Sequence, residues 1–283
     1  MNATRKQSGV TYTLPEGAKA TVTLSKPEKG KKVMVVLSGG QDSTTCLYWA
    51  KEHFEEVHAI TFNYGQKHEI EVKAAHRIAR LAEVASHEFV SIPHLLRSRS
   101  PLVSHGETLE QYDDFESMDK IIGDRVELTF VPMRNAFFLT VAANYALEKD
   151  CFDLVTGVCQ QDNANYPDCR QVFISSQEET INRALGIEQF KIHAPLMNMT
   201  KAESIALAKT LNGCMEALAY SHTAYDGQYP PVGKDHASVL RAQGFLEAMT
   251  PDPLVVRAWK EGLMALPDTP NYEELRNENS ASN

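Results

Sequence analysis

The sequence predicts an α/β protein built on a doubly wound parallel sheet, and three observations lead to this prediction. A short apolar run, VMVVL at 33–37, is typical of a strand buried on both faces of a parallel sheet. The segment SGGQDS follows directly and leads into a helical stretch. Beyond it, strand-like and helix-like segments alternate, which is the pattern of a doubly wound sheet.

Residues 1–31 precede this pattern and form an extension. Two β-rich runs, VTYTL and ATVTL, lie on either side of Pro15–Gly17 and favour a β-hairpin, with a disordered tail as the alternative. Further strands are expected at 57–62, 88–92 and 154–158, and helices at 44–53, 69–82, 135–147, 175–185 and 201–211. Thr200 and Glu203 predict a capping box at the start of the last of these helices.

Three stretches are less regular. Residues 97–127 are polar and predict a long loop or lid, and residues 219–238 are rich in Gly, Pro and Tyr. The polar tail after about residue 265 is expected to fray. We divide the chain into an extension at 1–31, a nucleotide-handling domain at 32–212 and a helical, irregular C-terminal region at 213–283.

The composition narrows the class of protein. The chain has 283 residues and a net charge of −9, and this charge argues against broad nucleic-acid binding, which needs positive surface. No apolar run approaches the ~20 residues that span a bilayer. Five cysteines without a C-x-x-C pair favour neither disulfides nor a thiolate zinc site. The cysteine usage fits a reducing cytoplasm, and the N-terminus lacks the apolar stretch of a secretory signal. We therefore expect a cytoplasmic protein, and from the charge and the short apolar runs no direct nucleic-acid or membrane partner.

The SGGQDS segment predicts a phosphate-binding loop. Glycines let the backbone approach a ligand, and the start of the following helix offers N–H groups and a positive dipole end. No Walker-type lysine is present, and Asp42 would repel a phosphate unless a cation such as Mg²⁺ offsets its charge. The residues predicted to hold the phosphates are Ser38, Gly39, Gly40, Gln41, Asp42, Ser43 and Thr44.

Other polar residues suggest ligand contacts, each with a simpler alternative. Arg134 and Asn135 can donate hydrogen bonds to a phosphate or carboxylate, or form an ion pair at a helix start. Asp168 could accept from a guanine-like edge or form a salt bridge with Arg170. Lys201 could screen phosphate charge or face solvent.

Two more residues complete this set of candidates. Asp162 has the same acceptor chemistry as Asp168 and suits the paired N–H groups of a guanine edge. Tyr166 could stack on a heterocycle or simply pack in the core.

These segments resemble a known family. SGGQDS resembles the PP-loop of ATP pyrophosphatases, and SGGQDSTTCL, TFVPMRN, TGVCQQDNANYPDCRQVF and APLMNMTKAE together resemble the 7-cyano-7-deazaguanine synthase (QueC) family. Met133 stands where that family usually has glycine. The resemblance covers most of residues 33–250 and implies a PP-loop domain of the Rossmann-like kind at 32–212.

The resemblance also implies an activity. ATP, with Mg²⁺, would adenylylate the carboxylate of 7-carboxy-7-deazaguanine; ammonia would give the amide, and a second ATP would give the nitrile. A homodimer is implied as well. We assign catalysis to Ser38, Asp42, Arg134 and Lys201, and substrate binding to Asn135, Asp162, Tyr166, Asp168 and Arg170.

The family carries four zinc-binding cysteines near the C-terminus, and this chain has none of them at the corresponding positions. The corresponding positions here are Ala224, Val232, Asp235 and Ser238. Alanine and valine cannot coordinate a metal, so we expect no zinc, and we interpret His222 and His236 as ordinary residues.

The lost cysteines, the extension and Met133 favour a specialised member of the family. Relatives in antiphage operons of the cyclic-oligonucleotide (CBASS) kind suggest that the acyl group passes to an amine on a partner protein. The alternatives are an ordinary synthase that uses ammonia and an inactive nucleotide-binding scaffold. The YPDCR block argues against another PP-loop enzyme such as NAD synthetase.

Overall fold

The computed structural model describes residues 8–13, 19–24, 32–65, 70–93, 95–103, 108–160, 164–225 and 227–281. Five parallel strands form its main sheet, in the order β5–β4–β3–β6–β7. They are β3 Lys32–Val36, β4 Glu56–Asn63, β5 Ser86–Ser91, β6 Asp153–Val155 and β7 Lys191–His193. The predicted doubly wound parallel sheet is confirmed, because successive strands run outward from β3 first to one side and then to the other.

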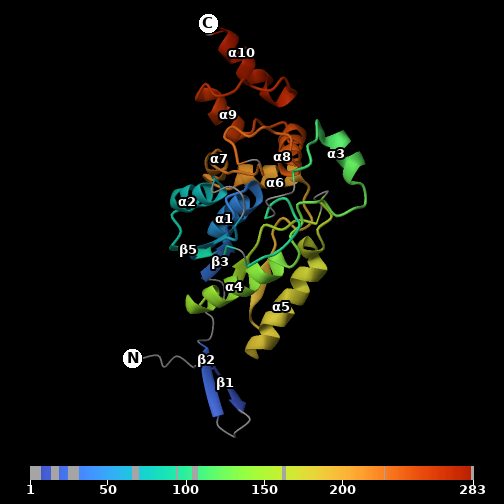
Figure 1. Ribbon diagram of the computed structural model, residues 1–283. Helices are drawn as coiled ribbons and strands as arrows, with labels where there is room; N and C mark the ends of the chain where they lie inside the picture. Colours follow the sequence, from blue (N-terminus) through green and yellow to red (C-terminus); the bar gives the residue numbers. More distant parts are fainter. Residues whose placement is uncertain are drawn as a thin grey trace, which may run out of the picture.

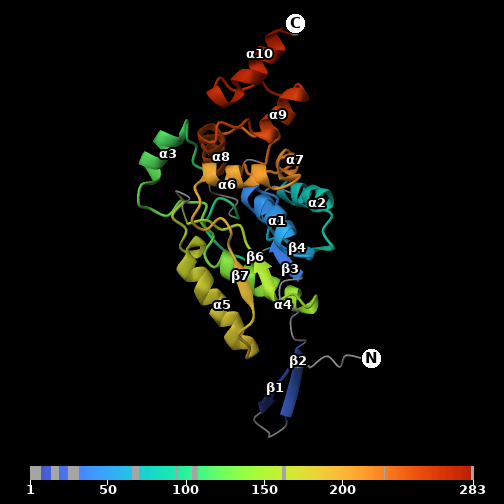
Figure 2. The same cartoon turned by 180° about the vertical axis from the view of Figure 1, so that it is seen from behind.

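Helices cover both faces of this sheet (Figure 1, Figure 2). On β3, Val33 and Val35 join the core cluster that includes residues of α1 and α2, whereas Met34 joins the cluster that includes residues of α4 and α5. This alternation follows from the two-residue period of a strand. The helices are α1 Gln41–His53, α2 Ile70–Leu81, α4 Arg134–Glu148 and α5 Gln171–Leu185.

Three C-terminal helices contribute residues to the same core cluster as α1: α6 Lys201–Thr210, α7 Cys214–Leu218 and α8 His236–Glu247. They are followed by α9 Pro253–Lys260 and α10 Glu273–Ala281. Gly244 of α8 lies so close to α6 that an added Cβ would stand 2.6 Å from the Lys201 Cβ. This contact holds the first residue of α6 against α8. The domain boundaries at 31 and 212 stay predictions.

Several local predictions are confirmed. The N-terminal hairpin pairs β1 Ser8–Thr13 with β2 Lys19–Leu24 in antiparallel register, although its turn lies outside the described residues. The Thr200 side chain accepts from the Glu203 N–H, and Glu203 accepts from the Thr200 N–H, as a capping box requires. In the part of the chain that the structure describes, no helix is long and apolar enough to cross a membrane.

Two predictions of irregular chain are wrong in part. Residues 97–127, expected to be a loop or lid, contain α3 Phe115–Ile122, which Asp114 caps and which buries Met118. The tail after residue 265 does not simply fray, because Tyr272 is buried and its hydroxyl accepts from the Asp252 N–H at 3.2 Å. In both cases a few apolar side chains in a polar stretch were enough to anchor it.

Candidate active site

A cavity of about 270 Å³ lies beyond the carboxyl ends of β3 and β6, where the strand order reverses. Open α/β sheets bind ligands at such a switch point. The first residues of four helices line it: Gln41 of α1, Arg134 of α4, Lys201 of α6 and His236 of α8. Helix N-termini carry unpaired N–H groups and positive dipole ends, so this main cavity is suited to a multiply charged anion.

Most of the predicted site residues meet in this main cavity. Those lining it are Ser38, Gly40, Gln41, Asp42, Ser43, Arg134, Asn135, Tyr166 and Lys201. Gly39, Thr44, Asp168 and Arg170 do not line it, and Asp162 lies outside the described residues.

The glycine loop is shaped by two close approaches. Gly39 has a φ of +90°, and an added Cβ would stand 2.4 Å from the Glu71 carbonyl oxygen, so only glycine fits there. Gly157, which follows β6, approaches so closely that its Cβ would lie 2.9 Å from the Ser43 nitrogen. Sequence reasoning did not single out Gly157, although it stands in the TGV block.

The loop hydroxyls divide into two groups. Ser38 and Ser43 share a hydrogen bond of 3.0 Å between their Oγ atoms and line the main cavity. Thr44 is fully buried, and its hydroxyl donates to the Gly40 carbonyl at 2.7 Å. Thr44 therefore stabilises the first turn of α1, and its hydroxyl does not reach the main cavity.

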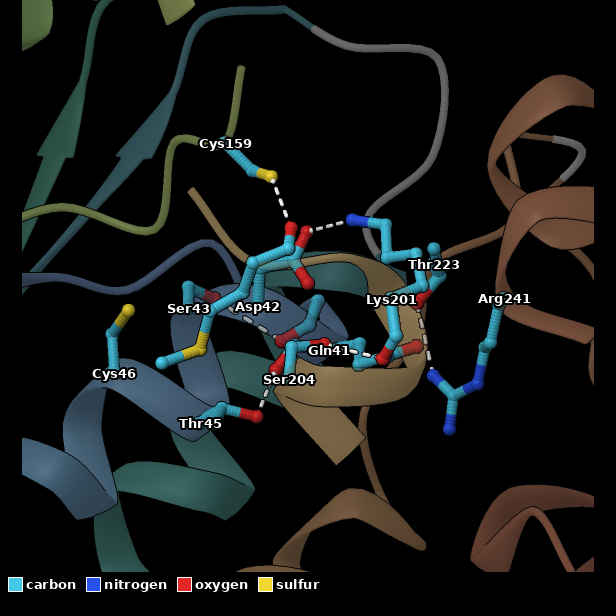
Figure 3. Close-up of polar contacts among 12 residues, drawn as sticks. Gln41, Asp42, Ser43, Thr45, Cys46, Cys159, Lys201, Ser204, Thr223 and Arg241 are labelled. Carbon is cyan, nitrogen blue, oxygen red and sulfur yellow. Dashed lines mark hydrogen bonds and ion pairs between the residues drawn. The ribbon is translucent and has the colours of Figure 1, made fainter. Parts of the chain in front are cut away.

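Asp42 and Lys201 form an ion pair across the main cavity. The Lys201 Nζ lies 2.7 Å from Asp42 Oδ2, and Figure 3 shows the ammonium group reaching over to the carboxylate. Lys201 lies in the cavity wall and is only partly exposed, so it does not simply face solvent. The lysine offsets the negative charge that would otherwise oppose a phosphate at this loop.

Arg134 places a positive charge in the wall of the main cavity and forms no ion pair with any described residue. Within the described part of the chain it has no carboxylate within ion-pair distance, and its Nη1 lies 3.5 Å from the Tyr64 hydroxyl. The alternative of an ion pair at the helix start is therefore wrong among these residues. A guanidinium in a cavity wall that forms no ion pair can still pair with an anionic group.

Asn135 and Asp168 hold each other in place. The Asn135 N–H donates to Asp168 Oδ2 at 3.3 Å, and Asn135 Nδ2 donates to the Asp168 carbonyl at 3.2 Å. Burial raises the pKa of Asp168, while the Asn135 N–H and the charge of Arg134 oppose this shift. Asp168 thus supports Asn135 from behind the cavity wall.

Tyr166 lies between the main cavity and a small cavity of about 50 Å³, which Arg170 also lines. The Tyr166 hydroxyl donates to Glu127 Oε2 at 3.2 Å and contacts the Thr129 hydroxyl. Arg170 is exposed and forms no ion pair with Asp168 among the described residues, so the salt-bridge alternative is not realised there. Glu127 and Thr129, which sequence reasoning missed, fix the orientation of Tyr166.

The segment where the resemblance implies a zinc site is held by side-chain contacts of this chain. Asp235 caps α8: its carboxylate accepts from the Ser238 N–H at 3.1 Å and from the Ser238 hydroxyl at 2.6 Å. Ala224 is buried and Val232 is exposed. No group of three or more His, Cys, Asp or Glu residues is arranged to hold a metal in the described ranges, and the lack of zinc stays a prediction.

A second anchor holds this segment from the other side. The guanidinium of Arg257 stacks 4.1 Å from the ring centre of Tyr229, and its Nε donates to the Tyr229 hydroxyl at 2.7 Å. Tyr229 in turn donates to Glu261 at 2.7 Å. The helix cap and this stacked pair are side-chain contacts that hold the segment in place.

We expect chelation to leave the protein folded. Structural zinc contributes on the order of 10 kcal/mol where it organises a small domain, so its removal would lower the Tm strongly. Here the cap at Asp235 and the Tyr229–Arg257 pair should keep the Tm unchanged after treatment with EDTA and phenanthroline. Thermal melts with and without chelator, together with elemental analysis, measure this; stoichiometric zinc and a falling Tm would contradict it.

Comparisons with known proteins agree with this geometry. The family model described as "Queuosine biosynthesis protein QueC" matches residues 32–249. A "7-cyano-7-deazaguanine synthase" of Gloeobacter violaceus is 44% identical over 238 residues, covering 81% of this chain and 96% of that protein. One of Laribacter hongkongensis is 46% identical over 225 residues, covering 79% and 94%.

Proposed function

This chain belongs to the QueC family of ATP-dependent, C–N bond-forming enzymes, and from that premise we propose that it adenylylates the carboxylate of a 7-carboxy-7-deazaguanine-like base. The acyl group then passes to an amine. The observation that supports this proposal best is Arg134, a cation without an ion pair among the described residues, in a cavity where four helices begin. An acyl-adenylate reaction brings a carboxylate and phosphates together, which such a cavity suits.

In the first step, a carboxylate oxygen attacks the α-phosphorus of ATP and pyrophosphate leaves. The N–H groups at the start of α1 and the hydroxyls of Ser38 and Ser43 would bind the departing pyrophosphate. Arg134 would hold the carboxylate against the α-phosphate, and Lys201 would neutralise charge beside Asp42. Positioning and charge neutralisation supply most of the rate in such a step.

Mg²⁺ fits this loop as part of the ATP complex. A single carboxylate together with phosphate oxygens is a usual way for proteins to hold Mg²⁺, and Asp42 is the carboxylate of the glycine loop. When bound, the ion would neutralise phosphate charge. Asp42 would then exchange part of its contact with Lys201 for the ion.

The base would lie toward the small cavity. Tyr166 would stack on it. Asn135, whose Nδ2 already donates to Asp168 and Cys169, would accept from it through its side-chain oxygen. Arg170, which lines the small cavity, and Asp162 remain proposed contacts of the base.

We propose that the attacking amine belongs to a partner protein and that the reaction serves a specialised role in antiphage defence. We also propose that the enzyme is a homodimer in the cytoplasm. The rebuilt zinc segment supports a role distinct from that of the relatives. A second candidate is an ordinary synthase that uses ammonia and forms the nitrile; identities of 44–46% with 7-cyano-7-deazaguanine synthases favour it. The third candidate is an inactive nucleotide-binding scaffold.

One experiment separates these functions. The purified protein is incubated with Mg-ATP, 7-carboxy-7-deazaguanine and ammonium, with and without the proteins encoded beside it, and the products are read by mass spectrometry. A deazaguanine acyl mass on a protein supports the conjugating enzyme, and a free amide or nitrile supports the ordinary synthase. ATP binding without AMP release supports the scaffold and contradicts the proposal.

A further inference from the structure

Glu71 is a carboxylate of the main cavity to which the proposed function gives no role. It lies in the first turn of α2, and in the described part of the chain Asp42 is the only other carboxylate that lines the cavity. Asp42 is paired with Lys201 at 2.7 Å, whereas Glu71 forms no ion pair with any described residue. Glu71 is therefore the carboxylate that this cavity leaves open to a ligand.

The fold holds Glu71 beside the glycine loop. Its carbonyl oxygen stands 2.4 Å from where a Cβ of Gly39 would be, so the first turn of α2 rests directly on the glycine loop. Gly39 has a positive φ and admits no side chain that would push α2 away. The Glu71 side chain consequently enters the cavity beside the loop that would bind pyrophosphate.

The burial of Glu71 and the charges around it suit it to accept a proton. Burial raises its pKa to about 7; Arg134 of α4 opposes this shift and Asp235, the cap of α8, adds to it. A catalytic base works best when its pKa lies near the operating pH. Because its charge is poorly compensated, the carboxylate would also attract an ammonium group.

We propose that Glu71 is a catalytic residue that binds the attacking amine and takes its proton during acyl transfer. This inference rests on the proposed function. The nitrogen lone pair forms the new C–N bond, and the bond between the acyl carbon and the phosphate oxygen breaks, with its electron pair leaving on AMP. The proton lost by nitrogen goes to the Glu71 carboxylate.

The test separates the two half-reactions. Carboxylate-dependent ATP–pyrophosphate exchange reports adenylylation, and amide formation, with ammonium or on a protein encoded beside the enzyme, reports transfer. In Glu71→Gln, transfer should fall about 10²–10⁴-fold, the usual contribution of a general base, and exchange should fall far less. Glu52→Gln, on the exposed end of α1, is the matched control and should change neither.

Two further readouts distinguish a base from a structural side chain. The transfer rate of the wild type should rise with pH through about 7, as Glu71 loses its proton, and Glu71→Gln should lose this rise. Hydroxylamine, which is neutral at this pH, should restore transfer in Glu71→Gln. Glu71→Asp should retain the rise at a lower rate, which keeps the test valid if the glutamine variant folds poorly.

The outcomes distinguish this inference from the proposed function. If the wild type shows no carboxylate-dependent exchange, the proposed function fails. If the wild type exchanges normally and Glu71→Gln transfers at the wild-type rate, only the role of Glu71 fails. An equal loss of exchange and transfer in Glu71→Gln would also overturn that role, because it would show a general defect of the site.

Discussion

Replacing Arg134 with glutamine should slow carboxylate-dependent ATP–pyrophosphate exchange by about 10²–10³-fold, the effect of removing one preorganised donor from a reacting anion. Arg134 opens α4 in the wall of the main cavity and has no carboxylate partner among the described residues. No ion pair among the described residues therefore holds its charge away from a ligand. The variant should stay folded, because no ion pair is lost when the guanidinium is removed.

Two variants control this result. Arg134→Lys keeps the charge but loses the planar fork that binds oxyanions at two points, so it should recover only part of the exchange rate. Arg183→Gln, on the exposed face of α5, should exchange at the wild-type rate. A folded Arg134→Gln protein with near-normal exchange would show that the carboxylate and phosphates bind elsewhere.

Replacing Arg241 with leucine should lower the free energy of unfolding by about 3–5 kcal/mol, the range for breaking one side of a buried ion pair. Arg241 and Asp252 are both 5% exposed, and two N–H groups of the arginine bind the two carboxylate oxygens at 2.6 and 2.8 Å. Its Nη1 also donates to Ser221 at 2.8 Å, and to Thr223 at 2.9 Å (Figure 3). The substitution would leave the Asp252 charge buried and uncompensated.

Urea denaturation measures this loss. Arg183→Leu is the matched control: it breaks an exposed pair with Glu179, which is worth less than about 1 kcal/mol. The double variant Arg241→Leu with Asp252→Asn should recover part of the stability, since it removes the buried charge as well. An Arg241→Leu protein as stable as the control would mean that the network contributes little.

The hydrogen bonds of Arg241 also tie the segment where the resemblance implies a zinc site to helix α9. Ser221 and Thr223 lie just before Ala224, the first of the former ligand positions, and Asp252 caps α9 by accepting from the Leu254 N–H. One arginine thus joins the start of the segment to the helix that carries Arg257, whose partner Tyr229 holds its middle. These contacts lie outside the main sheet and need no metal ion.

Local signals were predictable because they depend on neighbours in the sequence. The glycine loop and the capping box at Thr200 follow from residues within a few positions of one another. The cap of α8 carries such a signal as well, since Asp235 and Ser238 have the spacing of an N-cap residue and its N–H donor. The three-residue strand β7 is too short to leave a pattern.

By itself, the sequence determined the parallel sheet, the phosphate loop after its first strand and the family. Only the tertiary structure decided which charges in the cavity are neutralised. Lys201 lies 159 positions from Asp42 and yet cancels its charge, while Glu71 and Arg134 keep theirs without an ion pair among the described residues. The physical reason is that charge interactions depend on distance through space and on burial, and neither can be read from spacing along the chain.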